Sequence, residues 1–206
     1  MPQSRFIVLE GLEGAGKSGA AAALRQALES RGERVRLCRE PGGTPLAEEL
    51  RRLVKDIALN ERVLPETELL MMFAARCQLV GNVIRPALEA GDWVICDRFF
   101  YSTYAYQGGG RGLPDSDIDA IRKASLGDFA PSLVLLLDLD PEIGLERARG
   151  RGALDRFERE KIDFFTRVRR KYLELAALDS SFRVIDASRS RAEVEDAVLA
   201  ALPVRS

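Results

Sequence analysis

Histidine is absent from the 206 residues of this chain, and cysteine is scarce. Without histidine, the chain offers no His-based catalytic triad, no histidine metal ligand and no histidine general base. The three cysteines, Cys38, Cys77 and Cys96, are an odd number at unrelated spacings, which argues against a disulfide framework and a CxxC metal pair. Cys38 and Cys96 lie in apolar runs, so we expect buried free thiols and a reducing, cytoplasmic environment.

The chain also carries little net charge, −1, because it has 31 basic and 32 acidic residues. Non-specific nucleic-acid binding needs a basic surface, so the composition gives no case for a nucleic-acid partner. No apolar run approaches the roughly 20 residues that span a bilayer. The first residues lead directly into a strand-like run without a signal peptide, so we expect no membrane partner either.

Short apolar runs alternate with longer amphipathic stretches along the chain. The strand-like runs are 6–9, 35–38, 93–96, 133–137 and 182–185. Helical patterns cover 17–30, 45–57, 66–89, 115–125, 142–149, 158–178 and 192–202. This alternation predicts an α/β fold, with a five-stranded parallel sheet flanked by helices in a single domain over residues 1–206. We expect the glycine run 108–110 to be the most flexible stretch.

The segment 11–18 matches the phosphate-loop pattern GxxxxGK[ST], with a strand before it and a helix after it. Its glycines let backbone N–H groups converge on phosphate oxygens, and the helix N-terminus adds positive potential. In this pattern Lys17 neutralises the β- and γ-phosphates and the Ser18 hydroxyl binds Mg²⁺. The expected nucleoside triphosphate contacts are Gly11, Leu12, Glu13, Gly14, Ala15, Gly16, Lys17, Ser18 and Gly19.

Arginines stand at points where a phosphate acceptor would need them. An acceptor that is already anionic requires cations more than a carboxylate base. Arg98 follows the strand at 93–96, which places it at the carboxyl end of that strand, where ligands bind in such sheets. We expect Asp97 beside it to hold Mg²⁺ through water. Arginines also crowd the segment 147–158, whose glycines predict a lid that closes over a substrate.

An ordered set of motifs makes the chain resemble the bacterial thymidylate kinases along essentially its whole length. The motifs are Glu-Gly-Leu-Glu-Gly-Ala-Gly-Lys-Ser at 10–18, Arg-Glu-Pro-Gly-Gly-Thr at 39–44, Phe-Ala-Ala-Arg at 73–76, Asp-Arg-Phe at 97–99, Ser-Thr-Tyr-Ala-Tyr-Gln-Gly-Gly-Gly-Arg-Gly at 102–112, Gly-Asp-Phe-Ala-Pro-Ser-Leu at 127–133 and Leu-Asp-Arg-Phe-Glu at 154–158. The resemblance implies a P-loop nucleoside monophosphate kinase fold and the reaction ATP + dTMP → ADP + dTDP with Mg²⁺. It also implies a homodimer, commonly formed through long helices such as 66–89.

The same resemblance implies roles for individual residues. Glu13 would accept a hydrogen bond from the 3′-hydroxyl of dTMP, and Tyr106 would crowd the sugar 2′ position. Arg51 and Arg98 would hold the acceptor phosphate, while Arg76 would donate to a thymine carbonyl. The dTMP contacts that complete this set are Pro41, Phe73, Thr103 and Gln107, of which Thr103 and Gln107 fall where the family reads the thymine edge.

The phosphate loop itself contains no arginine, so the lid must supply the charge that meets the transferring phosphoryl group. We expect Arg151 to do this, with Arg149 and Arg156 in the same lid and Arg147 on ATP. The expected catalytic set is Lys17, Asp97, Arg98 and Arg151.

Two positions depart from the family pattern. Gly19 replaces a Thr or Ser, which puts a side-chain contact to the α-phosphate in doubt. Met72 stands where the thymine-stacking Phe is usual, with Phe73 one residue later, so either residue is a candidate to cover the base.

Two other interpretations stay open. A kinase for another monophosphate would need a different base-reading helix, so Arg76 would not determine its substrate preference. A nucleotide-sensing module that binds without turnover would need no Arg151.

Overall fold

The computed structural model describes residues 5–56, 61–150 and 155–203. In this part of the chain, five parallel strands form one sheet in the order β2-β3-β1-β4-β5. The strands are β1 (Phe6–Gly11), β2 (Val35–Arg39), β3 (Trp93–Asp97), β4 (Leu133–Asp138) and β5 (Phe182–Asp186). The expected α/β fold with a five-stranded parallel sheet is confirmed.

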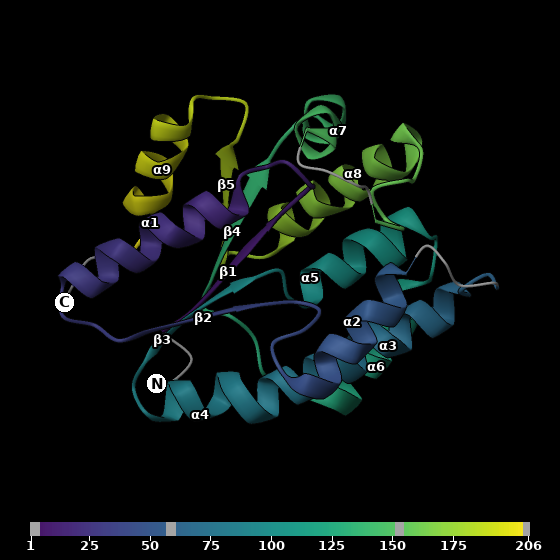
Figure 1. Ribbon diagram of the computed structural model, residues 1–206, viewed down its shortest axis with the longest axis horizontal. Coiled ribbons are helices and arrows are strands. Elements are labelled where there is room, and N and C mark those ends of the chain that lie inside the picture. The colour runs from purple at the N-terminus through teal and green to yellow at the C-terminus, as the bar shows by residue number, and fades with distance from the viewer. Residues whose placement is uncertain (1–4, 57–60, 151–154, 204–206) are drawn as a thin grey trace.

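Helices cover both faces of the sheet (Figure 1). They are α1 (Lys17–Ser30), α2 (Pro45–Lys55), α3 (Pro65–Leu79), α4 (Arg85–Glu89), α5 (Phe100–Thr103), α6 (Asp115–Leu126), α7 (Pro141–Arg149), α8 (Ile162–Leu178) and α9 (Arg191–Ala200), with π-helical segments η2 (Val80–Ile84) and η3 (Tyr104–Gly110). Among the described residues, no helix combines the length and apolar content needed to cross a membrane.

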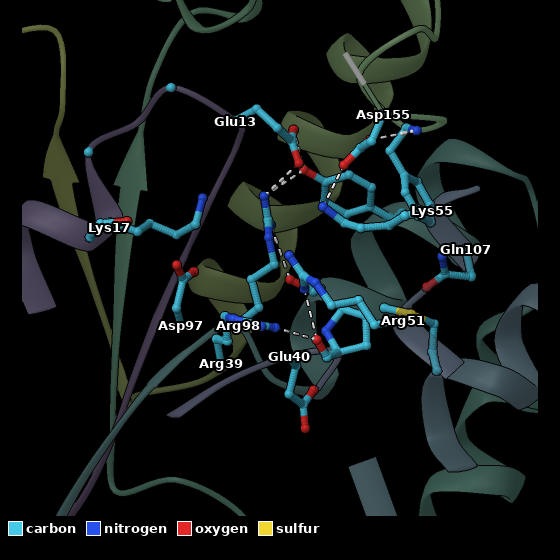
Figure 2. Close-up of a pocket in the computed structure, with 18 of the residues that line it drawn as sticks. Glu13, Lys17, Arg39, Glu40, Arg51, Lys55, Asp97, Arg98, Gln107 and Asp155 are labelled. Atoms are coloured by element: carbon cyan, nitrogen blue, oxygen red, sulfur yellow. Dashed lines mark hydrogen bonds and ion pairs between the residues drawn. The ribbon is translucent and has the colours of Figure 1, made fainter. Parts of the chain in front are cut away.

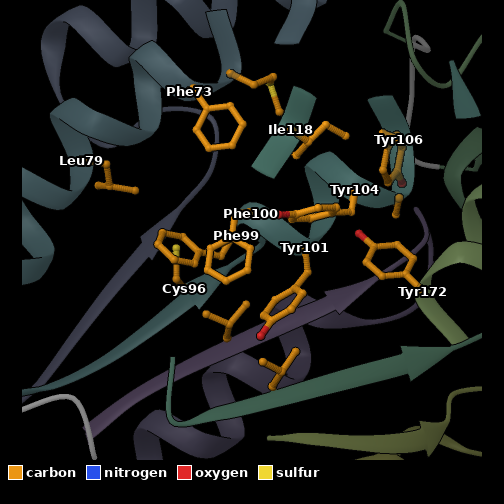
Figure 3. Close-up of a cluster of buried hydrophobic side chains, with 14 of the residues drawn as sticks. Phe73, Leu79, Cys96, Phe99, Phe100, Tyr101, Tyr104, Tyr106, Ile118 and Tyr172 are labelled. Atoms are coloured by element: carbon orange, nitrogen blue, oxygen red, sulfur yellow. The ribbon is translucent and has the colours of Figure 1, made fainter. Parts of the chain in front are cut away.

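Alternating side chains of the central strand divide the core into two layers. Ile7 and Leu9 of β1 pack with Leu24 and Leu28 of α1 in one layer. Phe6 and Val8 point to the other face and join the larger aromatic cluster that Figure 3 shows. The central strand β1 is buried along its whole length. This burial fixes its carboxyl end, where the chain enters the phosphate loop.

The helix expected at 66–89 is not a single α-helix. It consists of α3, the π-helical turn η2 and α4. The helix expected at 158–178 begins later, at Ile162, because Asp155 caps the preceding turn by accepting hydrogen bonds from the backbone N–H groups of Phe157 and Glu158. The helices expected at 115–125, 142–149 and 192–202 differ from α6, α7 and α9 by one or two residues. Position 57, the expected end of the helix at 45–57, lies outside the described residues.

The cysteine prediction is partly wrong. The three cysteines are free thiols, as expected, and Cys96 is buried in β3. Cys38 lies beside it in the register of β2 and β3 but is only half-buried, because β2 is an edge strand of the sheet.

The glycine run 108–110 was expected to be flexible, and this expectation is wrong. These glycines end η3 and pack directly against α8. A Cβ added at Gly109 would lie 2.7 Å from the Cβ of Lys171, and one added at Gly110 would lie 2.4 Å from the ring of Phe164. The glycines are therefore needed for close approach of two elements.

We predict that Gly110→Ala lowers the free energy of unfolding by about 1–3 kcal/mol, because the new methyl group overpacks the contact with Phe164. Gly81→Ala is the matched control: Gly81 is also in a π-helical segment, but a Cβ there meets no atom within 4 Å. Urea unfolding followed by circular dichroism measures both changes. Equal stability of the two variants would show that the contact with α8 does not require glycine.

Candidate functional site

A cavity of about 400 Å³ opens at the carboxyl edge of the sheet. Figure 2 shows charged side chains from several elements converging on it. Its lining residues are Glu13, Gly14, Gly16, Lys17, Ser18, Arg39, Glu40, Pro41, Arg51, Lys55, Met72, Asp97, Arg98, Ser102, Tyr106, Gln107, Arg147, Asp155 and Phe157. The phosphate loop forms one end of the cavity, and α2, α3 and η3 contribute to the other.

The phosphate loop needs its glycines at two tight approaches. A Cβ at Gly11, where φ is +134°, would lie 2.4 Å from the carbonyl oxygen of Leu137. One at Gly14, where φ is +76°, would lie 2.3 Å from the carbonyl oxygen of Gly144. Gly16 precedes α1 and makes no side-chain cap, so the first N–H groups of α1 remain for a ligand. This is the local geometry of an anion-binding loop.

Lys17 folds back onto this loop. Its Nζ donates to the carbonyl oxygens of Gly11 at 3.1 Å and Leu12 at 2.8 Å. Burial, together with the positive charge of Arg98, lowers the pKa of Lys17 to about 8, although Asp97 and Glu13 oppose the shift. The amine therefore lacks a full anionic partner and is placed to gain one from a bound phosphate.

Arg98 has the unusual backbone conformation of the site. Among the described residues, it is the non-glycine residue with positive φ, at 70°. Buried Glu10, near the end of β1, holds the turn that follows Arg98. Its carboxylate accepts hydrogen bonds from the backbone N–H groups of Phe99 at 2.8 Å and Ser102 at 3.2 Å. A strained backbone conformation of this kind persists where the surrounding structure holds it in place. Here this conformation directs the guanidinium of Arg98 into the cavity.

Glu13, Arg98 and Tyr106 form a polar cluster in the middle of the cavity. Arg98 Nη2 donates to Glu13 Oε1 at 2.8 Å, and the Tyr106 hydroxyl donates to Glu13 Oε2 at 2.7 Å. The guanidinium also lies over the Tyr106 ring, 5.0 Å from its centroid. Burial alone would raise the pKa of Glu13, but Arg98, Lys17 and the Tyr106 hydrogen bond outweigh it, so the pKa lies below its ordinary value.

Asp97 and Ser18 fit a site for Mg²⁺. The Oδ1 atom of Asp97 is buried and has no hydrogen-bond partner in the described structure, and both residues line the cavity next to the phosphate loop. Mg²⁺ keeps several waters and takes few protein oxygens when phosphates complete its shell. One carboxylate and one hydroxyl are therefore sufficient protein ligands here.

Cations gather at the end of β2 and on α2. The carbonyl oxygen of Pro41 accepts hydrogen bonds from Arg39 Nη1 at 3.1 Å and Arg51 Nη1 at 2.8 Å. The hydroxyl of Thr44 caps α2 by accepting from the N–H of Ala47, which fixes the helix that carries Arg51. Both guanidiniums line the cavity. Arg51 contacts a neutral carbonyl, which it can exchange for an anion, whereas Arg39 is also paired with Glu48 at 3.0 Å.

Several expected substrate residues lie behind the cavity wall. Arg76 is 1% exposed and donates to Glu40 Oε2 at 2.7 Å and to Thr103 Oγ1 at 3.1 Å. It also lies over the Phe73 ring, 4.8 Å from its centroid. Arg76, Phe73 and Thr103 therefore do not line the cavity in this structure, whereas Met72 does.

The lid arginines are only partly described. Arg147 lines the cavity and donates to the carbonyl oxygen of Ala187 at 3.1 Å. Arg156 does not line the cavity and donates to the carbonyl oxygen of Val54 at 2.7 Å and to Glu68 at 2.5 Å. Arg151 and the side chain of Arg149 lie outside the described residues.

Sequence reasoning missed part of the cavity lining. The missed residues are Arg39, Glu40, Lys55, Ser102, Asp155 and Phe157. Arg39 and Glu40 follow β2, so the strand-end argument used for Arg98 would have found them. Lys55 and Asp155 form an ion pair of 2.5 Å between segments one hundred residues apart. No local sequence pattern predicts that pairing. Burial raises the pKa of Glu40 to about 7 despite its contact with Arg76.

A phosphate loop after the first strand of a parallel sheet, facing an arginine- and tyrosine-lined chamber, defines a P-loop phosphotransferase of the nucleoside monophosphate kinase class. The family model described as thymidylate kinase matches residues 9–198. A thymidylate kinase of Idiomarina loihiensis is 54% identical over 96% of this chain and 96% of its own length. One of Shewanella loihica is 53% identical over 97% of this chain and 95% of its own. The chain belongs to the thymidylate kinase family.

The depressed pKa of Lys17 predicts proton uptake when a triphosphate binds. The phosphate charge will raise the pKa of the amine above about 8, so binding at pH 8.5 takes up a proton, whereas at pH 7 the amine is already largely protonated. Calorimetric titration of ATP in two buffers of different ionisation enthalpy measures this uptake.

Lys17→Arg is the matched control, because a guanidinium keeps the charge but does not titrate in this range. We expect no uptake at pH 8.5 in this variant. The same uptake in both proteins would assign the proton to another group.

Proposed function

We propose that the chain is a thymidylate kinase that transfers the γ-phosphoryl group of ATP to dTMP, giving ADP and dTDP. The observation that carries the proposal is the two-ended cavity, in which the phosphate loop faces the Glu13–Arg98–Tyr106 cluster. An oxygen of the acceptor phosphate attacks the γ-phosphorus, and the bond between that phosphorus and the β–γ bridging oxygen breaks. The site holds these groups in line and neutralises their charge.

The phosphate loop forms the half of the cavity that would bind ATP, the phosphoryl donor. Backbone N–H groups of residues 11–19 and the start of α1 bind the triphosphate, and Lys17 reaches the β- and γ-phosphates. Arg147 borders this half. Ser18 and Asp97 would hold Mg²⁺, which draws charge from the phosphates when bound. Arg151 is our choice for the arginine that meets the transferring group, because the loop contains none.

The acceptor half lies beyond Arg98. Arg98 and Arg51 carry the positive charge that a monophosphate requires, and Pro41 holds Arg51 toward the cavity. Glu13 is ionised and accepts hydrogen bonds, so it suits the 3′-hydroxyl of a deoxyribose. Tyr106 is fixed at both ring and hydroxyl, which makes it a rigid wall against a 2′-hydroxyl.

The base would occupy the region between Met72 and Gln107. A polarisable methionine covers a planar base well, which favours Met72 over Phe73 as the stacking residue. Arg76 and Thr103 lie behind this wall, and Arg76 would have to exchange its contact with Thr103 to reach a thymine carbonyl. We also propose a cytoplasmic homodimer, supported by Leu70 of α3, which is 57% exposed.

A panel of nucleoside monophosphates tests the assignment. In a coupled assay of ADP release with ATP and Mg²⁺, dTMP should give the highest kcat/KM among dTMP, AMP, CMP and GMP. A preference for AMP, CMP or GMP would favour a kinase for that monophosphate. Tight ATP binding without ADP release on any acceptor would favour a nucleotide sensor.

Glu13→Gln should weaken dTMP binding about tenfold or more while changing ATP affinity little. The reason is that a charge-assisted hydrogen bond to the acceptor sugar is lost, whereas the backbone N–H groups, Lys17 and Ser18 that would bind ATP are unchanged. Isothermal titration with each ligand separately measures the two affinities. An equal loss of affinity for both ligands would show that Glu13 maintains the structure of the loop and does not bind the sugar.

A further inference from the structure

Glu68 is a buried carboxylate that the proposed reaction does not use. It lies on the first turns of α3 and is 1% exposed, yet it lines no part of the cavity. Its Oε1 accepts a hydrogen bond from Gln107 Nε2 at 2.7 Å. Gln107 does line the cavity, so Glu68 contacts the site through one side chain.

Two arginines compensate the charge of Glu68. Arg111 donates to both carboxylate oxygens at 3.3 Å, and Arg156 donates to Oε2 at 2.5 Å. Their guanidiniums lie over Phe164 and Phe157, respectively, which fixes them in turn. A carboxylate that is buried and surrounded by donors in this way is a fixed group of hydrogen-bond acceptors.

The chemistry of an amide gives this contact a consequence. Gln107 has a donor end, Nε2, and an acceptor end, Oε1, and a rotation of about 180° would exchange them. An ionised carboxylate only accepts, so Glu68 can bind only the donor end. The acceptor end must then point the other way, and Figure 2 shows the oxygen of Gln107 directed toward the side of the cavity where Arg51 lies.

That oxygen is the unusual atom of the arrangement. Gln107 Oε1 is buried and has no hydrogen-bond partner in the described structure. A buried acceptor without a partner is unfavourable until a ligand supplies a donor. A pyrimidine with an N3–H group supplies one, whereas cytosine presents a lone pair at N3.

We propose that Glu68 is a positioning residue for base specificity, which fixes the amide of Gln107 so that the cavity accepts a thymine-type N3–H and rejects a cytosine-type N3. The inference rests on the proposed function and adds a residue outside the cavity that determines which base edge the enzyme reads. Glu68 does not touch the substrate, and it acts only through Gln107.

The test compares dTMP with 5-methyl-dCMP, because these acceptors share the sugar, the phosphate and the methyl group and differ only at the N3 and C4 edge. Glu68→Gln should lower the ratio of their kcat/KM values about tenfold or more, because a neutral amide at 68 allows either orientation of Gln107. A residue of merely structural importance would lower both values together and leave the ratio unchanged.

Glu160→Gln is the matched control. Glu160 also pairs with Arg111, but no hydrogen bond joins it to Gln107 in the described part of the chain, so this variant should keep the wild-type ratio. The exchange variant Glu68→Gln with Gln107→Glu keeps the net charge and restores a fixed acceptor toward the base. It should recover the preference for dTMP, and it carries the test alone if Glu68→Gln does not fold.

A wild-type ratio in Glu68→Gln, an equal fall in Glu160→Gln, or a folded exchange variant without preference for dTMP would each overturn the proposal. These outcomes leave the proposed function standing, because they concern only how the base edge is selected. A wild-type protein that does not prefer dTMP to 5-methyl-dCMP would also overturn this proposal, whereas the proposed function fails only if dTMP is not the preferred acceptor among dTMP, AMP, CMP and GMP.

Discussion

The buried carboxylate of Glu10 is the interaction on which the site depends. It is the next-to-last residue of the central strand β1, is 0% exposed, and accepts hydrogen bonds from two backbone N–H groups and from the hydroxyls of Ser102 and Tyr172. Burial raises its pKa, while the charge of Arg98 and these hydrogen bonds act against the shift. Removing such a network would leave a buried charge or several unpaired donors, so the turn after β3 has little freedom.

This constraint explains why the strained residue is also the central cation. The turn after β3 is held by Glu10, and the guanidinium of Arg98 is held by hydroxyls of Ser102 and Tyr172 at 3.3 and 3.1 Å. These contacts, all within the protein, hold the backbone of Arg98 at a φ of 70°. Because the protein's own hydrogen bonds fix the position of this charge, substrate binding requires less ordering.

The other cations of the cavity also have hydrogen-bond partners within the protein. Lys17 is bound to loop carbonyls, Arg51 to the carbonyl of Pro41, and Arg98 to Glu13. Each of these contacts is weaker or more easily exchanged than a contact with a phosphate, because carbonyls are neutral and Glu13 can turn to a hydroxyl. Substrate binding is therefore an exchange of partners in a preformed site, without the cost of building the site.

The sequence was sufficient to predict the sheet, the phosphate loop and the strand-end residues, because each depends on local pattern. Apolar runs predict the buried strands, and the glycine spacing before Lys17 predicts the loop. The positions of Arg76 and Phe73 behind the wall, and of Met72 on it, depend on how α3 rotates against η3, which no local pattern encodes. The glycine run at 108–110 shows the same limit: composition suggested flexibility, whereas contact with α8 gives it a rigid role.

The burial of Glu68 is the clearest feature that local sequence patterns could not predict. A glutamate near the start of a helix is usually solvated and stabilises the helix dipole, so its sequence position suggests a surface residue. Its burial follows from three partners on separate segments: Gln107 in η3, Arg111 after η3, and Arg156 before α8. Because Arg156 also donates to the carbonyl oxygen of Val54 in α2, one carboxylate connects the cavity-lining Gln107 to α2 and to the segment before α8. Segments that lie far apart in the sequence therefore meet at one buried charge, and the interactions of this charge depend on the tertiary packing and not on any local pattern of residues.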